Sequence, residues 1–248
     1  MCIRDRGQCY SGQVATPYPG YTPMIVKFDE HQKMPTTRIE YSYYLMAVDA
    51  GLQMMPSRLL EGEQTAHFLT ERFDRQNGKK VHIQTLAAMN PSADSYEALF
   101  EAACRIGVPP GELRQLFRSM VLNVLGGNVD DHNKNFSFLM DDDGHWHVAP
   151  TYDYTFSVDP DAPYYVNRHS MTINNKTEGI TAEDLLEVAR RYGIKAAEPF
   201  IEKAIGIVSH YPEYGREAGV GEEWIGTIEK EIAARIECVS DNRADRLK

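Results

Sequence analysis

Residues 128–153 read NVDDHNKNFSFLMDDDGHWHVAPTYD and contain the densest cluster of polar residues in the chain, followed by two apolar runs. Two apolar runs, FSFLM and HWHVA, flank the turn DDDG, which is the pattern of a β-hairpin. The arms of a hairpin run antiparallel, so its two ends lie together. We therefore expect Asn135, at the base of one arm, to lie close to Asp153, just past the other, beside the loop that carries Asp130.

Two carboxylates and an amide in this arrangement suit phosphoryl transfer. One carboxylate orients the attacking hydroxyl or accepts its proton, while an amide oxygen and a second carboxylate hold Mg²⁺ against the nucleotide phosphates. In protein kinases the first carboxylate and the amide are separated as Asp-x₄-Asn, and the second carboxylate follows a short hairpin. Asp130 and Asn135 have that spacing, and Asp153 has that position. The spacing alone is a weak signal, but the hairpin and the second aspartate make it strong.

The clearest helix precedes this loop and is expected over 113–125. Its apolar residues follow one another at steps of 3, 1, 3, 1, 3 and 1, which gives one unbroken stripe. Pro110 suits its first turn, and Gly126-Gly127 supplies an end that tolerates the left-handed conformation. Further helices are expected at 96–106, at 181–192 with a capping-box-like start, and at 224–239.

The first third of the chain reads as short strands around one helix. The expected strands are 24–28, 59–60 and 66–73, and the expected helix is 36–52. After Gly78 the composition becomes helical. The predicted fold class is α+β: a two-lobed, protein-kinase-like fold with a small, incomplete β-rich N-lobe and a larger, mainly helical C-lobe. The expected domains are an unassigned leader at 1–22, a partial N-lobe at 23–76, and a C-lobe with the catalytic loop and metal-binding hairpin at 77–248.

Composition limits the other classes. The chain has 248 residues, of which 42% are hydrophobic and 25% charged, so disordered, collagenous and disulfide-scaffold proteins are excluded. Its net charge of −10 argues against direct binding to nucleic-acid phosphates. The four scattered cysteines form no C-x-x-C pair and indicate reduced thiols in a cytoplasmic protein. No apolar run approaches the roughly 20 residues that span a bilayer, so no membrane association is expected.

The small lobe supplies matching parts. Lys27 is the lysine of its strand and would point at phosphates, and Glu40 on the following helix could pair with it, as a strand lysine pairs with a helix glutamate in kinases. Residues 71–75, at the junction of the lobes, could offer backbone groups to an adenine edge.

Four motifs occur in order along the chain: PMIVKF at 23–28, ERFDR at 71–75, DDHNKN at 130–135 and APTYD at 149–153. Together they resemble the HipA family, the serine/threonine kinase toxins of bacterial type II toxin–antitoxin systems. The resemblance runs from about Pro23 to the C-terminus.

The resemblance implies an ATP-dependent serine/threonine kinase that uses Mg²⁺. It makes Asp130 the catalytic aspartate, and Asn135 and Asp153 the Mg²⁺ ligands. The implied partners are a protein substrate, which in similar family members is an aminoacyl-tRNA synthetase, and a DNA-binding antitoxin.

The same resemblance implies the remaining nucleotide contacts. Lys27 would contact phosphates, His132 would lie near them, and Lys134 would join the nucleotide site. Glu71 and Phe73 would meet adenine through their backbone.

The chain departs from the family at its front. The family carries a Gly/Ser-containing phosphate loop, with an autophosphorylated serine, ahead of the strand lysine. Here 26 residues precede Lys27, and Ser11-Gly12 does not reproduce that loop. We therefore expect an N-terminal truncation, with weak ATP binding and poor turnover, and assign no autophosphorylation site. The alternative function is a truncated, catalytically impaired module that still binds nucleotide or an antitoxin.

Some residues also allow other interpretations. Asp130, Asp131 and His132 could belong to a metal-dependent phosphohydrolase, although too few further ligands can be placed, and Asp131 could simply cap the loop. The DDDG sequence lacks the spaced ligands of a calcium loop and is read as a turn. His145 and His147 alternate on one strand face, which favours a half-exposed face over a metal site.

Overall fold

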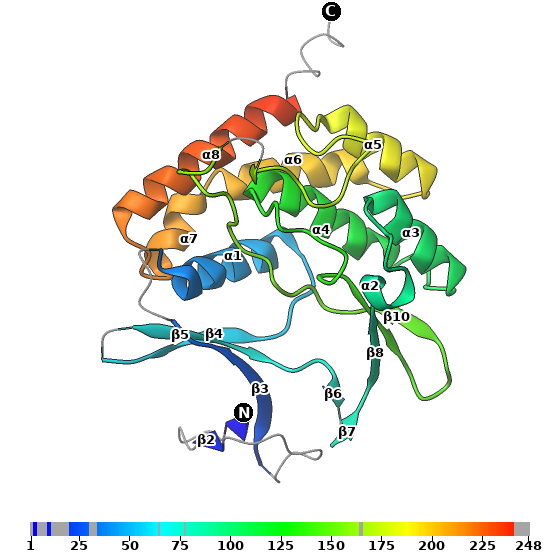
Figure 1. Cartoon of the computed structure of the whole chain (residues 1–248), viewed down its shortest axis with the longest axis horizontal. Coiled ribbons are helices and arrows are strands. Elements are labelled where there is room, and N and C mark those ends of the chain that lie inside the picture. The colour runs from blue at the N-terminus through cyan, green and yellow to red at the C-terminus, as the bar shows by residue number, and fades with distance from the viewer. Residues whose placement is uncertain are drawn as a thin grey trace, which may run out of the picture.

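The computed structural model describes residues 20–29, 34–63, 65–76, 78–163 and 166–240, together with the backbone of 2–3 and 9–10. A sheet lies at one end of the molecule and a layered group of helices at the other (Figure 1). In the described part of the chain this sheet has the order β2-β1-β3-β5-β4, with antiparallel neighbours. Its strands are β1 (Cys2–Ile3), β2 (Cys9–Tyr10), β3 (Thr22–Lys27), β4 (Ser57–Glu61) and β5 (Ala66–Glu71).

The predicted strands of the first third are confirmed. In the register of β3 and β5, Met24 lies opposite Glu71 and Lys27 opposite Phe68, so the sheet buries a small cluster around Met24 and Leu69. The front of the chain differs from expectation, since no element was predicted before residue 23 and yet β1 pairs with both β2 and β3. Ser11 and Gly12, on which the comparison with a phosphate loop depends, lie outside the described residues.

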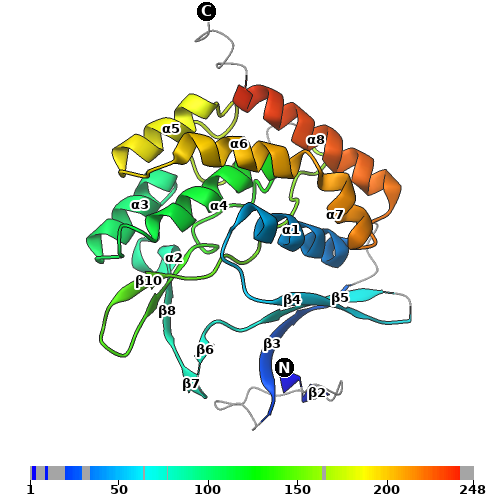
Figure 2. The same cartoon turned by 180° about the vertical axis from the view of Figure 1, so that it is seen from behind.

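Helix α1 (Thr36–Ala50) packs between the sheet and the helices, as Figures 1 and 2 both show. It contacts β4 and β5 on one side and α6 and α7 on the other. Ile39 and Tyr43 of this helix belong to the main hydrophobic core, so that core continues from the first third of the chain into the helical part. α1 ends at Gly51, whose φ of 87° is in the left-handed region that glycine adopts without strain.

The segment directly after Gly78 forms strands that were not predicted from the sequence, before the first of the expected helices begins. β8 (His82–Thr85) pairs with β9 (Ser137–Met140), which pairs with β10 (Trp146–Val148), so the predicted hairpin is confirmed but lies within a larger sheet of order β10-β9-β8. A short ribbon, β6 (Arg75–Gln76) with β7 (Lys79–Lys80), leads into β8.

The helices that follow form the larger part of the molecule. They are α2 (Leu86–Met89), α3 (Tyr96–Arg105), α4 (Leu113–Gly126), α5 (Ala182–Arg191), α6 (Ala197–Val208), α7 (Tyr211–Glu217) and α8 (Glu222–Ser240). The helices predicted at 96–106, 113–125, 181–192 and 224–239 are confirmed.

Helix α4 lies in the middle of this group, against α3, α6 and α8, which explains why its apolar stripe is so regular. It ends at Gly127, in the left-handed conformation, as predicted. Pro110, in contrast, lies in the preceding turn, because the helix begins at Leu113 with Glu112 as its N-cap. Helix α5 has the predicted capping box, in which Thr181 and Asp184 bond each other's backbone N–H.

Two further observations bear on the sequence analysis. Cys104 is an exposed free thiol and Cys238 Sγ lies 3.6 Å from the carbonyl of Ile180, whereas the side chains of the other cysteines lie outside the described residues. Within the described ranges, no helix has both the length and the apolar character needed to span a membrane.

Candidate functional site

The hairpin brings the loop at 128–135 against the segment at 151–153. Val148 lies opposite Phe138, and the backbone N–H of Ala149 donates to the carbonyl of Ser137 at 3.0 Å, so the ladder continues toward Asn135. The hydroxyl of Tyr152 then donates to the carbonyl of Lys134 at 2.8 Å and lies 2.5 Å from Ser137 Oγ. Tyr152 therefore joins the segment that carries Asp153 to the predicted catalytic loop.

A second set of bonds fixes the start of that loop. Ser157 Oγ accepts hydrogen bonds from the backbone N–H groups of Val129 and Asp130, at 2.8 and 3.0 Å. Asn128 Nδ2 lies 3.4 Å from the carbonyl of Asp153. Asp153 itself has a φ of 54°, a conformation that costs energy for a residue other than glycine and that clusters at functional sites. The backbone around Asp130 and Asp153 is thus held as one unit.

Within the loop, the side chains of Asp130 and Asn135 are presented differently. Asn135 Nδ2 donates to the carbonyl of Asp130 at 2.8 Å, which fixes the orientation of the amide. Its acceptor atom, Oδ1, is left available to bind a cation. The Asp130 side chain is 66% exposed, so its carboxylate can meet an incoming group. His132 Nε2 lies 3.7 Å from Asp130 Oδ1, and its buried Nδ1 has no hydrogen-bond partner among the described residues.

Lys27 joins the sheet to this assembly. Its Nζ donates to Glu40 Oε1 at 2.7 Å and also contacts Asp153 Oδ1, so the predicted pairing of Lys27 with Glu40 is confirmed. Burial lowers the pKa of Lys27, but the two carboxylates outweigh it and raise that pKa above its usual value. Burial raises the pKa of Glu40 to about 7, against the opposing effect of the ammonium. A cation and two carboxylates from distant parts of the sequence therefore meet at one point.

The chain between α1 and β4 makes this meeting possible. Thr151 N–H donates to the carbonyl of Gln53 at 2.8 Å, and Met54 forms a parallel bridge with Thr151. These bonds place the end of the hairpin beside the chain that leaves α1.

A pocket of about 410 Å³ opens where these parts meet. That volume is within the roughly 300–1,000 Å³ range of small-molecule sites. Five of the predicted site residues line it: Lys27, Glu71, Phe73, Lys134 and Asp153. The other predicted site residues do not line this pocket among the described residues and lie on the adjoining loop: Asp130, His132 and Asn135. Asn135 borders a smaller cavity together with Ser137 and Tyr152.

The apolar walls of the pocket were not predicted as site residues: Ile25, Met54, Met55, Phe68, Ile83 and Tyr152. The rings of Phe73 and Tyr152 lie 5.6 Å apart between centroids. The sequence could have pointed to Tyr152 as a pocket residue, because it is aromatic and directly precedes the predicted metal ligand Asp153. No such indication exists in the sequence for Ile83, because its position in the pocket depends on the pairing of β8 with β9.

At the junction, the ERFDR segment is held rigidly by its own charges. The Asp74 carboxylate bonds the guanidinium groups of Arg72 and Arg75, at 2.6 to 2.8 Å. Burial opposes ionisation, but the two arginines outweigh it and hold the pKa of Asp74 below its ordinary value. Glu71 and Phe73, which line the pocket, thus stand next to a turn that is braced by these ion pairs.

Asp131 is directed away from this site. Its side chain is 0% exposed and accepts hydrogen bonds from Tyr96 and His169, each at 2.8 Å. A carboxylate engaged in the interior does not join Asp130 and His132 as a metal ligand, so the geometry does not favour the phosphohydrolase alternative.

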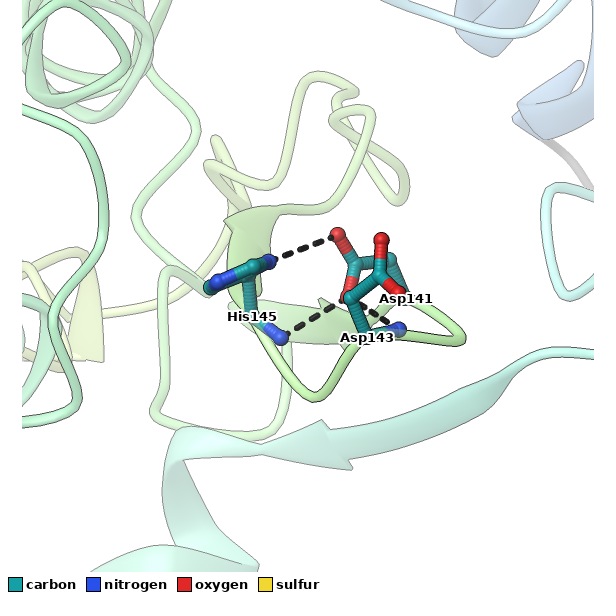
Figure 3. Close-up of side chains that lie close together, drawn as sticks. All are labelled: Asp141, Asp143 and His145. Atoms are coloured by element: carbon teal, nitrogen blue, oxygen red, sulfur yellow. Dashed lines mark hydrogen bonds and ion pairs between the residues drawn. The ribbon is translucent and has the colours of Figure 1, made fainter.

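The turn of the hairpin carries a separate group of polar side chains, drawn in Figure 3. Asp141 Oδ1 accepts the backbone N–H groups of Asp143 and His145, which confirms the predicted turn. His145 and His147 both contact Asp141 Oδ2, at 3.3 and 3.2 Å, so they lie on the same side as predicted, although His145 precedes β10 and is not part of the strand. His147 also bonds Glu112, at 2.8 Å. One ligand atom from each of Asp141, Asp143 and His145 lies within 4.8 Å of the others, but all three residues are exposed.

The fold and the site define a protein with a kinase-like fold, in which a small sheet and a mainly helical part enclose a pocket. The family described as "HipA-like C-terminal domain" matches residues 9–213, so the chain belongs to that family.

Solved structures agree on the fold. The HipA chain of the Shewanella oneidensis complex of HipA, HipB and operator DNA matches with a TM-score of 0.66 and 19% identity, over 91% of this chain and 63% of that one. The Helicobacter pylori proinflammatory kinase CtkA matches with a TM-score of 0.57 and 18% identity, over 90% of this chain and 91% of that one.

One curated relative is the Sinorhizobium fredii protein named "Putative kinase Y4mE". It is 24% identical over an alignment of 164 positions, and the match covers 59% of this chain and 39% of the relative. The chain thus spans less than two thirds of the length of both Y4mE and the HipA protein.

Proposed function

We propose that this chain is an ATP-dependent serine/threonine protein kinase of the HipA type, which transfers the γ-phosphate of ATP to a protein hydroxyl. The observation that carries the proposal is the meeting of Lys27, Glu40 and Asp153 in the lining of the pocket. A strand lysine paired with a helix glutamate, beside a metal-binding aspartate, is the arrangement that positions nucleotide phosphates in kinases.

The pocket supports a division of roles. Its apolar walls, with Phe73 and Tyr152, suit a purine ring, and the backbone of Glu71 and Phe73 suits the adenine edge. Lys27 and Lys134 also line the pocket, where their ammonium groups would bind phosphate oxygens.

Asp130 would receive the proton of the acceptor hydroxyl. Its carboxylate is exposed and its backbone N–H is bonded by Ser157, so an acceptor can approach a base that is carried on an anchored loop. His132, next to it, would lie near the phosphates.

The donor set fits Mg²⁺. Asn135 Oδ1 and the Asp153 carboxylate are oxygen ligands, which Mg²⁺ prefers, and Asn135 Nδ2 is already engaged by the carbonyl of Asp130. When bound with ATP, Mg²⁺ offsets the charge on the phosphates. In the structure Asp153 bonds Lys27 instead, so the two cations would share this carboxylate.

The proposed partners follow from the family. The Shewanella HipA forms a complex with HipB and operator DNA. We assign this chain an antitoxin partner that contacts DNA, because its own net charge of −10 opposes direct DNA binding. The proposed substrate is a serine or threonine of a protein, such as an aminoacyl-tRNA synthetase.

The test is phosphate transfer from [γ-³²P]ATP with Mg²⁺ to an immobilised library of serine and threonine peptides. Wild type should label peptides, Asp130→Asn should lose about 10²–10⁴-fold in rate with ATP affinity nearly intact, and the matched control Asp142→Asn should behave as wild type. Asp142 is a suitable control because its side chain is 96% exposed on the hairpin turn. ATP binding without transfer would favour the impaired-module alternative, and an equal rate for Asp130→Asn would refute the assigned base.

A further inference from the structure

Asp130 and Asp131 are neighbours in the sequence with opposite surroundings. The Asp130 side chain is 66% exposed, whereas the Asp131 side chain is 0% exposed. Asp131 Oδ2 accepts hydrogen bonds from the Tyr96 hydroxyl and from His169 Nδ1, both at 2.8 Å. Asp131 Oδ1 accepts from the backbone N–H of Ser170 at 2.8 Å. A buried carboxylate is tolerated here because donors surround both of its oxygens.

Arg235 of α8 fixes the state of the histidine in this cluster. Arg235 Nη1 lies 3.3 Å from His169 Nε2. A guanidinium only donates hydrogen bonds, so Nε2 accepts and the ring hydrogen is on Nδ1, directed at Asp131. The orientation of the Asp131 carboxylate is therefore set from as far away as α8.

A second branch leads from Asp131 back to the site. The Tyr96 hydroxyl accepts a hydrogen bond from Asn123 Nδ2 at 2.9 Å, and Asn123 Oδ1 accepts one from Asn128 Nδ2 at 2.9 Å. Asn128 Oδ1 in turn accepts from Ser157 Oγ at 3.2 Å, and Ser157 Oγ receives the backbone N–H of Asp130. Asp131 thus connects to the backbone of its own neighbour through a continuous chain of hydrogen bonds.

We infer that Asp131 is a positioning residue for phosphoryl transfer, which holds the Asp130 carboxylate toward the acceptor by anchoring the loop from behind. This inference rests on the kinase activity proposed above. The anchored Asp131 side chain is buried while the adjacent Asp130 side chain is exposed, so the anchor fixes the loop without covering Asp130. A displacement of about 1 Å at a reacting group can cost on the order of 100-fold in rate, so a small rotation of the loop is sufficient to matter.

The network predicts which substitutions fail. Asp131→Asn would place an amide N–H opposite a donor. The Tyr96 hydroxyl can rotate to accept it, but His169 cannot change tautomer while Arg235 donates to its other nitrogen. Arg235→Met removes that constraint, so the double variant Asp131→Asn/Arg235→Met should recover part of the rate that Asp131→Asn loses.

The experiment measures kcat on the peptide that wild type labels best, together with ATP affinity and thermal unfolding. Asp131→Asn should lower kcat about 10- to 100-fold, with ATP affinity within about threefold of wild type. Tyr96→Phe removes a single hydroxyl, should lower kcat in the same direction, and guards against misfolding of the first variant. The matched control is Tyr192→Phe, which also removes a hydroxyl that bonds a residue of α3, the Glu97 carbonyl, and should keep the wild-type kcat.

Unchanged kcat in both Asp131→Asn and Tyr96→Phe would overturn the inference, as would a parallel loss of kcat, ATP affinity and folding, which would mean a purely structural role. An inactive wild type would instead refute the proposed function. A readout without nucleotide is the ¹⁵N spectrum of the His169 ring. The Nδ1–H tautomer is expected in wild type, and the Nε2–H tautomer would contradict the network.

Discussion

Replacing Lys27 by Met should make the stability of the chain fall as pH rises above neutrality. The Glu40 side chain is 10% exposed, and the Lys27 ammonium compensates its charge from 2.7 Å. Burial nevertheless raises the pKa of Glu40 from 4.5 to about 7. For a group with a raised folded-state pKa, the contribution to stability is complete below the unfolded value and is lost as pH rises through the folded value. In wild type this loss ends just above pH 7, whereas in Lys27→Met the pKa of Glu40 rises further and the loss continues.

The size of the pH-dependent difference in unfolding free energy follows from the single proton that Glu40 binds or releases. Near pH 6 the Glu40 carboxyl is mostly protonated in both proteins, so it adds almost nothing to their difference. At about pH 8 it is mostly ionised in wild type and protonated in the variant, which gives a difference of about 1–2 kcal/mol. The folding equilibrium constant of the variant should fall about tenfold further, relative to wild type, for each additional pH unit.

Urea unfolding of wild type, Lys27→Met, Glu40→Gln and the double variant at about pH 6, 7 and 8 tests this. Against the Glu40→Gln background, Lys27→Met should have the same effect at every pH, because the titrating group is gone. With Glu40 present, a difference in unfolding free energy between wild type and Lys27→Met that stays constant from about pH 6 to 8 would refute the reasoning. Glu40 would then carry no charge that Lys27 compensates.

Three further outcomes are expected. Hydrogen bonds to Glu112 and Asp141 raise the pKa of His147, so the stability that they add is present at low pH and is lost as pH rises through that pKa. His147→Gln should therefore weaken the pH dependence of the thermal-unfolding midpoint from about pH 6 to 8. Parallel pH profiles for wild type and variant would contradict this. Gly126→Ala would put a Cβ 2.6 Å from the buried hydroxyl of Tyr154 and should cost about 1–3 kcal/mol in urea unfolding; an unchanged midpoint would mean that the core relaxes around it. Asp153→Asn should abolish the gain in ATP affinity that Mg²⁺ gives in calorimetry, and a retained gain would place the metal elsewhere.

Much of the fold could be predicted because its signals are local. The two apolar runs around DDDG, the stripe of α4 and the capping residues of α5 each specify an element within a few neighbouring residues. The pairing of Lys27 with Glu40 could also be predicted, because it needs only a strand followed by a helix.

The elements that were missed depend on tertiary contacts. The four residues of β8 become a strand by pairing with β9, which lies more than fifty residues further along the chain. Helix α6 was missed for a local reason instead, because its N-cap, Ala196, makes no side-chain capping bond and so gives no start signal in the sequence.

The candidate site also has a part that the sequence could predict and a part that depends on tertiary contacts. Its polar residues carry recognisable spacing, whereas Met54, Met55 and Ile83 line the pocket only because separate segments meet there. The anchoring of Asp131 by His169 and Arg235 is equally non-local, so sequence reasoning could go no further than a cap for the loop.

The most direct test of the central claim is a crystal structure of the chain with Mg²⁺ and a non-hydrolysable ATP analogue. We expect the purine in the pocket beside Phe73 and Tyr152, the triphosphate against Lys27, and the metal on Asn135 and Asp153. A nucleotide bound on another face, or a metal held by the hairpin turn instead of these two residues, would contradict the assignment of this pocket as a kinase site.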